Sequence, residues 1–265
     1  MTEDLPMATD PDGTGIYTPG AFVWHELLSR DPAKAQHFYT EMFGWTVEQV
    51  EMSDMDYYLF YLGDKRIAGM YDINTLAHGE GITPHWQGYV SVPDVDKAAA
   101  AAEAAGARHV LGPIDSPNIG RFALVEDPQG AVMLVFKDAN GDPDPIDMPM
   151  IGNFCWDVLV TTNLEAAAAF YELVIGWEMD VHGAEKGMFK YGELHEAGTK
   201  LAPEGVPPNW RAYIGVTDLV AATEKAAALG ATIIRANQPT GDWGRLSIIQ
   251  DPVGAVVALF QASED

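Results

Sequence analysis

One sequence pattern occurs twice in this chain of 265 residues, and the duplication constrains the fold more than any other feature. Residues 24–45 read WHELLSRDPAKAQHFYTEMFGW, and residues 156–177 read WDVLVTTNLEAAAAFYELVIGW. Each copy has an apolar strand, a helix N-cap (Asp31 or Asn163), a Phe-Tyr pair on an apolar helix face and a glycine that ends the helix. The repeat predicts two modules of the same fold.

Each module in turn repeats a strand–helix–three-strand unit. In the first module the expected strands at 46–51, 57–62 and 65–71 are followed by a new strand and capped helix that begin near Trp86. The later half of each module ends in an Asp-Pro-x-Gly turn, at 127–130 and 251–254, before its last strand. We therefore expect an α+β fold of four such βαβββ units.

Composition along the chain suggests the domain boundaries. Residues 1–20 are acidic and rich in turn formers, which predicts a flexible arm. The first module then covers 21–138 and the second 151–262. Between them, residues 139–150 are rich in proline, aspartate and glycine, which is typical of a linker.

Charge and composition exclude several classes of function. The formal net charge of −24 repels phosphate backbones and anionic membrane surfaces, so we expect no nucleic-acid partner and no membrane partner. Cys155 is the single cysteine, so no intramolecular disulfide can form. With no apolar run of 18 residues and no signal-peptide pattern, we expect a cytoplasmic protein.

The duplicated Phe-Tyr…Gly helix and Asp-Pro-x-Gly turn resemble the vicinal oxygen chelate superfamily, also called the glyoxalase/bleomycin resistance/dioxygenase superfamily. More narrowly, the chain looks like the tandem two-module glyoxalase-like proteins of actinobacteria. This resemblance implies that the paired βαβββ units of each module curl into an open barrel around a concave pocket.

The resemblance also implies where metal-using members would place their ligands: on the first, fifth and last strands of a module. In this chain those positions are held by Trp24, Gln87 and Leu134, and then by Trp156, Arg211 and Ala258. Indole, isobutyl and methyl groups do not ligate divalent cations, and a guanidinium repels them. We therefore expect no metal and no cofactor at these positions. A His78-x-Glu80 pattern occurs elsewhere, in a glycine-containing loop.

Strand alternation extends these positions into a predicted pocket lining. The ligand-binding candidates are Trp24, Glu26, Gln87, Tyr89, Arg121, Leu134, Trp156, Arg211, Tyr213 and Arg245. Their aromatic and apolar character is typical of a small-molecule site.

The charged candidates distinguish the two modules. In the first, Arg121 has a possible partner in Glu26, whereas Val158 replaces this glutamate in the second. Arg211 and Arg245 would then face the second pocket without a carboxylate, which suggests an anionic ligand. The alternative is that Asp157 or Glu193 reaches in to pair with them. Either way, we do not expect the two pockets to be equivalent.

Two classes of function follow from these expectations. The first is a metal-free protein that binds, or transforms without a metal, an aromatic or secondary metabolite. The alternative is a metal-dependent glyoxalase or dioxygenase-type lyase in detoxification. The sequence leaves open whether the protein is an enzyme, and whether it is a monomer or a homodimer.

Overall fold

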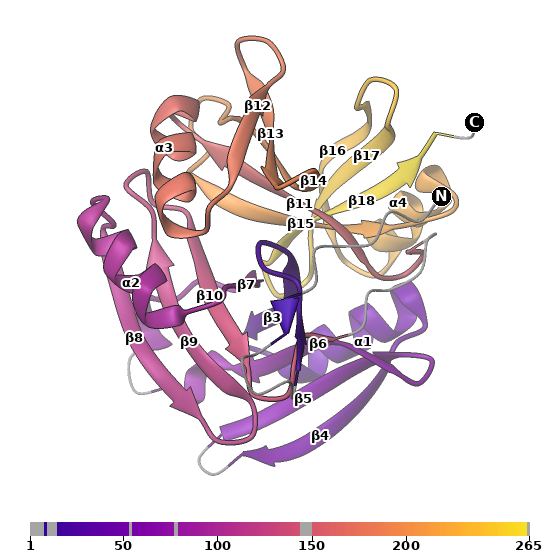
Figure 1. Ribbon diagram of the computed structural model, residues 1–265. Coiled ribbons are helices and arrows are strands. Elements are labelled where there is room, and N and C mark those ends of the chain that lie inside the picture. Colours follow the sequence, from indigo (N-terminus) through magenta and orange to yellow (C-terminus); the bar gives the residue numbers. More distant parts are fainter. Residues whose placement is uncertain (1–7, 10–14, 53–54, 77–78, 144–149, 264–265) are drawn as a thin grey trace. The chain divides into compact units, whose positions relative to one another are not determined.

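The computed structural model describes residues 8–9, 15–52, 55–76, 79–143 and 150–263. Its strands form two eight-stranded sheets of mixed direction, one from each module, and a small sheet that pairs β1 (Ala8–Thr9) with β2 (Ile16–Tyr17) (Figure 1). This arrangement confirms the predicted α+β fold of two tandem modules. No helix in the described ranges is long and apolar enough to span a membrane.

Contacts within the chain define two compact units that do not follow the two modules. Unit 1 contains Met1–Val23, Gly88–Pro145 and Trp156–Trp210, whereas unit 2 contains Trp24–Gln87, Ile146–Cys155 and Arg211–Asp265. Each unit therefore combines one half of the first module with one half of the second.

Unit 2 takes the first half of module 1 and the second half of module 2. The first set is β3 (Phe22–Ser29, from Trp24 onward), α1 (Pro32–Phe43), β4 (Thr46–Met52), β5 (Met55–Leu62), β6 (Lys65–Asp72) and the short 3-10 helices η1 (Ile73–Thr75) and η2 (Gly79–Gly81). The second set is β15 (Asn209–Gly215, from Arg211 onward), α4 (Leu219–Ala228), β16 (Thr232–Pro239), β17 (Gly244–Gln250) and β18 (Val256–Ala262).

Unit 1 takes the complementary halves. From module 1 it has β7 (His85–Ser91, from Gly88 onward), α2 (Val95–Ala104), β8 (His109–Ser116), β9 (Gly120–Glu126) and β10 (Val132–Asp138). From module 2 it has β11 (Phe154–Thr161, from Trp156 onward), α3 (Leu164–Val174), β12 (Glu178–Val181), β13 (Lys186–Tyr191) and β14 (Leu194–Leu201).

The helices begin where the sequence predicts. The Asp31 side chain accepts a hydrogen bond from the Lys34 backbone N–H at 3.0 Å, and the Asn163 side chain accepts one from the Ala166 backbone N–H, also at 3.0 Å. These bonds satisfy N–H groups that have no partner within the helix. Gly44 ends α1 at φ 71°, in the left-handed region that favours glycine.

The two duplicated motifs meet inside each unit. In unit 2 the Tyr39 hydroxyl of α1 donates to Asp251 Oδ2 at 2.7 Å and accepts from Trp86 Nε1 at 2.7 Å. The other oxygen of Asp251 accepts from the backbone N–H groups of Val253, Gly254 and Ala255, which fixes the Asp-Pro-x-Gly turn. The Phe-Tyr motif of one module therefore binds the turn of the other.

Unit 1 contains the same arrangement with the modules exchanged. The Tyr171 hydroxyl donates to Asp127 Oδ2 at 3.0 Å and accepts from Trp210 Nε1 at 2.9 Å. Burial raises the pKa of both tyrosines well above the usual value and also raises the pKa of Asp127. Each polar chain lies in an apolar cluster where its groups have no access to water, so their partners must come from the protein.

The end of the predicted N-terminal arm is part of the fold. The Tyr17 side chain is buried, and its hydroxyl donates to the Asp138 carbonyl at 3.0 Å. The Thr18 backbone N–H donates to Asp142 Oδ2 at 2.7 Å. Residues 15–20 are therefore held against the start of the predicted linker, whose residues 144–149 lie outside the described ranges.

We predict that Tyr39→Phe and Tyr171→Phe each lower the free energy of unfolding by about 1–3 kcal/mol. Each change removes a buried hydroxyl and leaves a carboxylate oxygen and an indole N–H without their partner. Denaturant unfolding would measure the loss. Tyr61→Phe is the matched control, because its hydroxyl bonds an exposed Glu48 carboxylate. Equal stability of the control and the two buried variants would contradict this account.

Candidate functional site

Most of the candidate site residues lie on the faces of the two sheets that are opposite the helices, whereas Arg121 and Arg245 do not. Within each unit, strand register shows which side chains share such a face, because successive residues alternate between the two sides. Each unit presents two of these faces, one from each module. We call them helix-free faces.

The module 1 face of unit 2 is filled by its own side chains. The Tyr57 hydroxyl bonds the carboxylate of Glu26 and accepts from the Trp24 indole. Burial, followed by the charge of Glu26, raises the pKa of Tyr57 and also that of Tyr71. A side chain at Gly69 would collide with the Tyr57 hydroxyl, so glycine is required there. The phenol therefore occupies the space between the predicted ligand-binding residues Trp24 and Glu26.

Gln87 belongs to the same unit and is 3% exposed. Its Oε1 lies 3.2 Å from His85 Nε2, and the other ring nitrogen of His85 lies 2.8 Å from the Thr83 carbonyl. The one residue at a family ligand position that could bind a metal is therefore engaged by a neighbouring side chain.

The module 1 face of unit 1 is apolar. Leu134 of β10 pairs in register with Tyr89 of β7, and the Tyr89 ring lies 5.7 Å from that of Phe136 in an edge-on orientation. Leu134 is buried and Tyr89 half-buried. Both predicted residues share this face.

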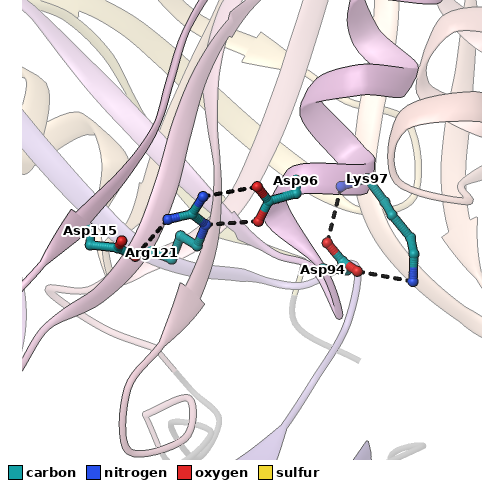
Figure 2. A network of polar contacts seen from close by, with 5 residues as sticks. All are labelled: Asp94, Asp96, Lys97, Asp115 and Arg121. Carbon is teal, nitrogen blue, oxygen red and sulfur yellow. Dashed lines mark hydrogen bonds and ion pairs between the residues drawn. The ribbon is translucent and has the colours of Figure 1, made fainter.

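Arg121 lies elsewhere, and its proposed pairing with Glu26 is wrong. Its guanidinium binds Asp96 through Nε and Nη2, both at 2.8 Å, and Asp115 through Nη1 at 2.7 Å (Figure 2). Asp115 is the register partner of Arg121 on β8, and Asp96 lies in the first turn of α2. Both acids belong to unit 1, as Arg121 does, so the guanidinium is satisfied within its own unit. These bonds lower the pKa of Asp96.

The module 2 face of unit 2 carries a buried arginine, Arg211. Its side chain is 7% exposed, and its Nε has no hydrogen-bond partner. Within the described residues of unit 2 no carboxylate forms an ion pair with it. Asp157 and Glu193, the alternative partners considered above, belong to unit 1. Burial lowers the pKa of the guanidinium. Tyr213 lies two residues along β15 on the same face, and its ring is 6.2 Å from that of Phe260.

Arg245 does not join Arg211 on this face. Its Nε donates to Asn237 Oδ1, its Nη2 donates to the Asn237 carbonyl at 2.8 Å, and the side chain is exposed. Asn237 lies in an irregular part of β16 directly beside the start of β17, which brings its two oxygens within reach of Arg245. Of the two arginines predicted to face this pocket, Arg211 is buried on this face and Arg245 is not.

Unit 1 contains a half-buried carboxyl group on β14, that of Glu196, which sequence reasoning missed. Val158 of β11, Gly198 of β14 and Met188 of β13 share one register row, and Glu196 lies two residues before Gly198. Glu196 is an extra residue in β14, since Ala197 pairs with Phe189 and His195 with Lys190. Burial alone raises the pKa of Glu196 to about 7.

The family's metal does not fit this chain. The indole N–H of Trp24 is already a donor to Tyr57, Arg211 brings a positive charge, and Leu134 and Ala258 offer no donor atom. Among the residues that the structure describes, no three His, Cys, Asp or Glu side chains are grouped to hold a metal ion. His78 of the His78-x-Glu80 pattern lies outside those residues.

Two surface grooves lie away from the helix-free faces. One, of about 300 Å³, runs between the end of α1 and the start of α4 and includes Met42 and Lys225. The other, of about 380 Å³, lies beside Arg121 and Lys137. Both are open to solvent and contain none of the buried, unpartnered polar groups, so we base the site on Arg211 instead.

We expect Glu196→Gln to change how stability depends on pH. Because the pKa of Glu196 is raised on folding, its contribution is fully present below the unfolded pKa, near 4.5, and is lost as the pH rises through about 7. Glutamine does not titrate. The melting temperature of the variant, relative to the unmodified protein, should therefore increase between mildly acidic and mildly alkaline pH. A constant difference across that range would show that Glu196 is not desolvated.

Comparisons with known sequences agree with the duplicated architecture. Residues 21–134 match the family model described as Glyoxalase/Bleomycin resistance protein/Dioxygenase superfamily, and residues 153–260 match the Glyoxalase-like domain. A Mycobacterium bovis protein that carries the name glyoxylase CFP32 is 29% identical over 252 residues, covering 92% of this chain and 96% of that protein. The anthracycline biosynthesis protein DnrV of Streptomyces peucetius is 29% identical over 266 residues, covering 94% and 95%.

Solved structures share the fold. The Mn(II)-bound glyoxalase from Novosphingobium aromaticivorans superposes with a TM-score of 0.64 at 15% identity, covering 93% of this chain and 83% of that one. The 2,3-dioxygenase LapB from Pseudomonas sp. KL28 gives 0.61 at 13% identity, covering 95% and 94%. With its two matched domains in tandem, the chain belongs to the glyoxalase/bleomycin resistance/dioxygenase superfamily.

Proposed function

We propose that this protein binds an aromatic small molecule with an acidic group, without a metal, and that Arg211 binds the anion. One observation carries the proposal: Arg211 is buried, its Nε has no partner, and no carboxylate of the described chain pairs with it. A buried charge normally has a partner, because taking it out of water costs several kcal/mol. An anionic ligand would supply that partner.

The surroundings of Arg211 favour an aromatic acid. A guanidinium presents several N–H donors in a planar fork, which matches the two oxygens of a carboxylate and also binds a phenolate or enolate. Tyr213 and Phe260 lie on the same face and offer ring surface. Aromatic side chains around a few polar groups are the usual composition of a small-molecule site.

Module 2 is the better candidate for binding. On the module 1 face of unit 2, Tyr57 already satisfies Glu26 and Trp24, so those groups need no ligand. The corresponding module 2 residues are Val158 and Trp156, and the buried arginine belongs to module 2 as well. This contrast supports one binding module and one whose polar groups are satisfied internally.

The metal-dependent alternative draws its support from the comparisons. One relative is named a glyoxylase, and one structure with the same fold is a Mn(II)-bound glyoxalase. The residues at the family's ligand positions oppose it, since Arg211 would repel the cation and Ala258 has no donor. Because DnrV is named for anthracycline biosynthesis, polycyclic aromatic ligands should be screened first, both for binding and for turnover.

Substitution of Arg211 tests the anion site directly. We expect 2-naphthoate to bind more tightly than its neutral amide, and Arg211→Gln to weaken naphthoate binding by about 1.5–3 kcal/mol, the range for hydrogen bonds to charged groups. Binding of the amide should change little. Calorimetric titration measures both, with Arg235→Ala as an exposed control. If Arg211→Gln destabilises the fold and leaves the naphthoate affinity unchanged, the arginine is structural and the proposal fails.

Elemental analysis separates the metal-free proposal from its alternative. After dialysis, the purified protein should contain no stoichiometric zinc, nickel, iron or manganese, and EDTA should leave its melting temperature unchanged. The expectation follows from the side chains at the six ligand positions. About one equivalent of metal per module would overturn it and favour the metal-dependent lyase.

A further inference from the structure

The strands that form the module 2 face of unit 2 contain no acidic residue. Strands β15, β16, β17 and β18 contain the arginines Arg211, Arg235 and Arg245 but no aspartate or glutamate. The corresponding module 1 strands, β7 to β10, contain acidic residues such as Asp115 and Glu126. In a chain with 39 acidic and 15 basic residues, this part of the sheet is a local region of positive charge.

The orientation of β17 shows which of its side chains lie on the helix-free face. The Thr223 hydroxyl of α4 donates to Ser247 Oγ at 2.8 Å, so Ser247 faces the helix. Because successive strand residues alternate, Ile248 lies on the helix-free face. Ile248 is the register partner of Arg235 on β16, the edge strand of this sheet. Paired residues of neighbouring strands share a face, so Arg235 lies on the helix-free face as well.

The same register row continues across the sheet to Tyr213. Ile248 pairs with Ala258 of β18, and Ala258 pairs with Tyr213 of β15. Arg211 lies two residues before Tyr213, on this face and one row away. With strands about 4.8 Å apart and a rise of about 3.3 Å per residue, the Cα atoms of Arg211 and Arg235 are about 16 Å apart. The aromatic and apolar side chains of the row lie between the two arginines.

Module 1 has an apolar residue at the position of Arg235. In unit 1, Leu111 of β8 pairs with Leu124 of β9, as Arg235 of β16 pairs with Ile248 of β17. Leu111 is exposed, so this edge position is open to solvent in module 1 too. The exchange of leucine for arginine gives module 2 a cation at the edge of its helix-free face, which module 1 lacks.

Arg235 has no acidic partner within the described ranges. Its Nη1 donates to the carbonyl of Ile234, the residue before it, at 3.4 Å, and its side chain is exposed. By the same alternation Arg245 lies on the opposite side of the sheet, where it bonds Asn237. Arg235 is therefore the second arginine on the face that carries the buried Arg211, and its guanidinium is free to bind a ligand.

We infer that the ligand bound at Arg211 is an aromatic acid with a second acidic group, and that Arg235 binds this second group at the edge of the sheet. The inference rests on the proposed anion site at Arg211 and adds to it the class of ligand and a residue that determines specificity. A rigid aromatic dicarboxylate suits the spacing, because its ring lies along the row from Tyr213 to Ile248 while each guanidinium binds one carboxylate.

The test compares naphthalene-2,6-dicarboxylate with its monomethyl ester at neutral pH. The ester keeps the ring and one carboxylate but loses the second negative charge. The net charge of −24 by itself disfavours the dianion, so a preference for the dianion reports a local cation. By calorimetry at low ionic strength we expect the dicarboxylate to bind about five-fold more tightly than the ester, and added salt to reduce this preference. Two equivalent carboxylates alone would give a statistical advantage of only about two-fold.

Substitution of Arg235 assigns the preference to this residue. Arg235→Gln should reduce it to the statistical value and leave the affinity for the ester unchanged. Arg66→Gln is the matched control and should keep the preference, because it removes an exposed arginine from β6 of the same unit. The inference is overturned if the unmodified protein shows no preference beyond the statistical value, or if the preference survives Arg235→Gln.

The result is distinct from the outcome for Arg211. If the ester binds and Arg211→Gln weakens it, while the dicarboxylate shows no preference, the anion site stands and the contact with Arg235 is wrong. If neither compound binds, both proposals are overturned. The comparison of the two compounds uses the unmodified protein, so it decides the inference even if a variant fails to fold.

Discussion

A buried hydrogen bond between a helix tyrosine and a turn aspartate is the interaction on which each unit depends. Tyr39 binds Asp251 in unit 2, and Tyr171 binds Asp127 in unit 1. In both cases the tyrosine comes from one module and the aspartate from the other, and an indole N–H satisfies the hydroxyl as an acceptor. The aspartate also fixes the turn before the last strand, so one polar chain links a helix, a turn and a strand within an otherwise apolar core.

This interaction explains which parts of the fold could be predicted. The caps at Asp31 and Asn163 and the Asp-Pro-x-Gly turns are local signals, and the structure confirms the four repeated units that they indicate. The sequence did not predict that each unit combines one half of module 1 with one half of module 2. Periodicity within a segment does not show which distant segment packs against it. The repeated Phe-Tyr and Asp-Pro-x-Gly motifs were visible in the sequence, but their mutual contact was not.

The candidate site residues, like the fold, could be predicted only where local sequence determines their position. Alternation along β15 correctly placed Arg211 in a buried position next to Tyr213. It failed for Arg121 and Arg245, since both lie near strand starts where local oxygens from Asp115 and Asn237 capture the guanidinium. Glu196 was missed because an extra residue in β14 alters the pairing around it, and a bulge of this kind has no reliable signature in one sequence.

The central claim is that a buried arginine without a protein partner is an anion site of a metal-free binding module. A crystal structure of the protein with 4-iodobenzoate would test it most directly, because the anomalous signal of iodine locates the ligand independently of its interpretation. The account predicts an iodine peak near Tyr213 and Phe260, with the carboxylate on the guanidinium of Arg211. Iodine elsewhere, together with a protein carboxylate bound to Arg211, would contradict it.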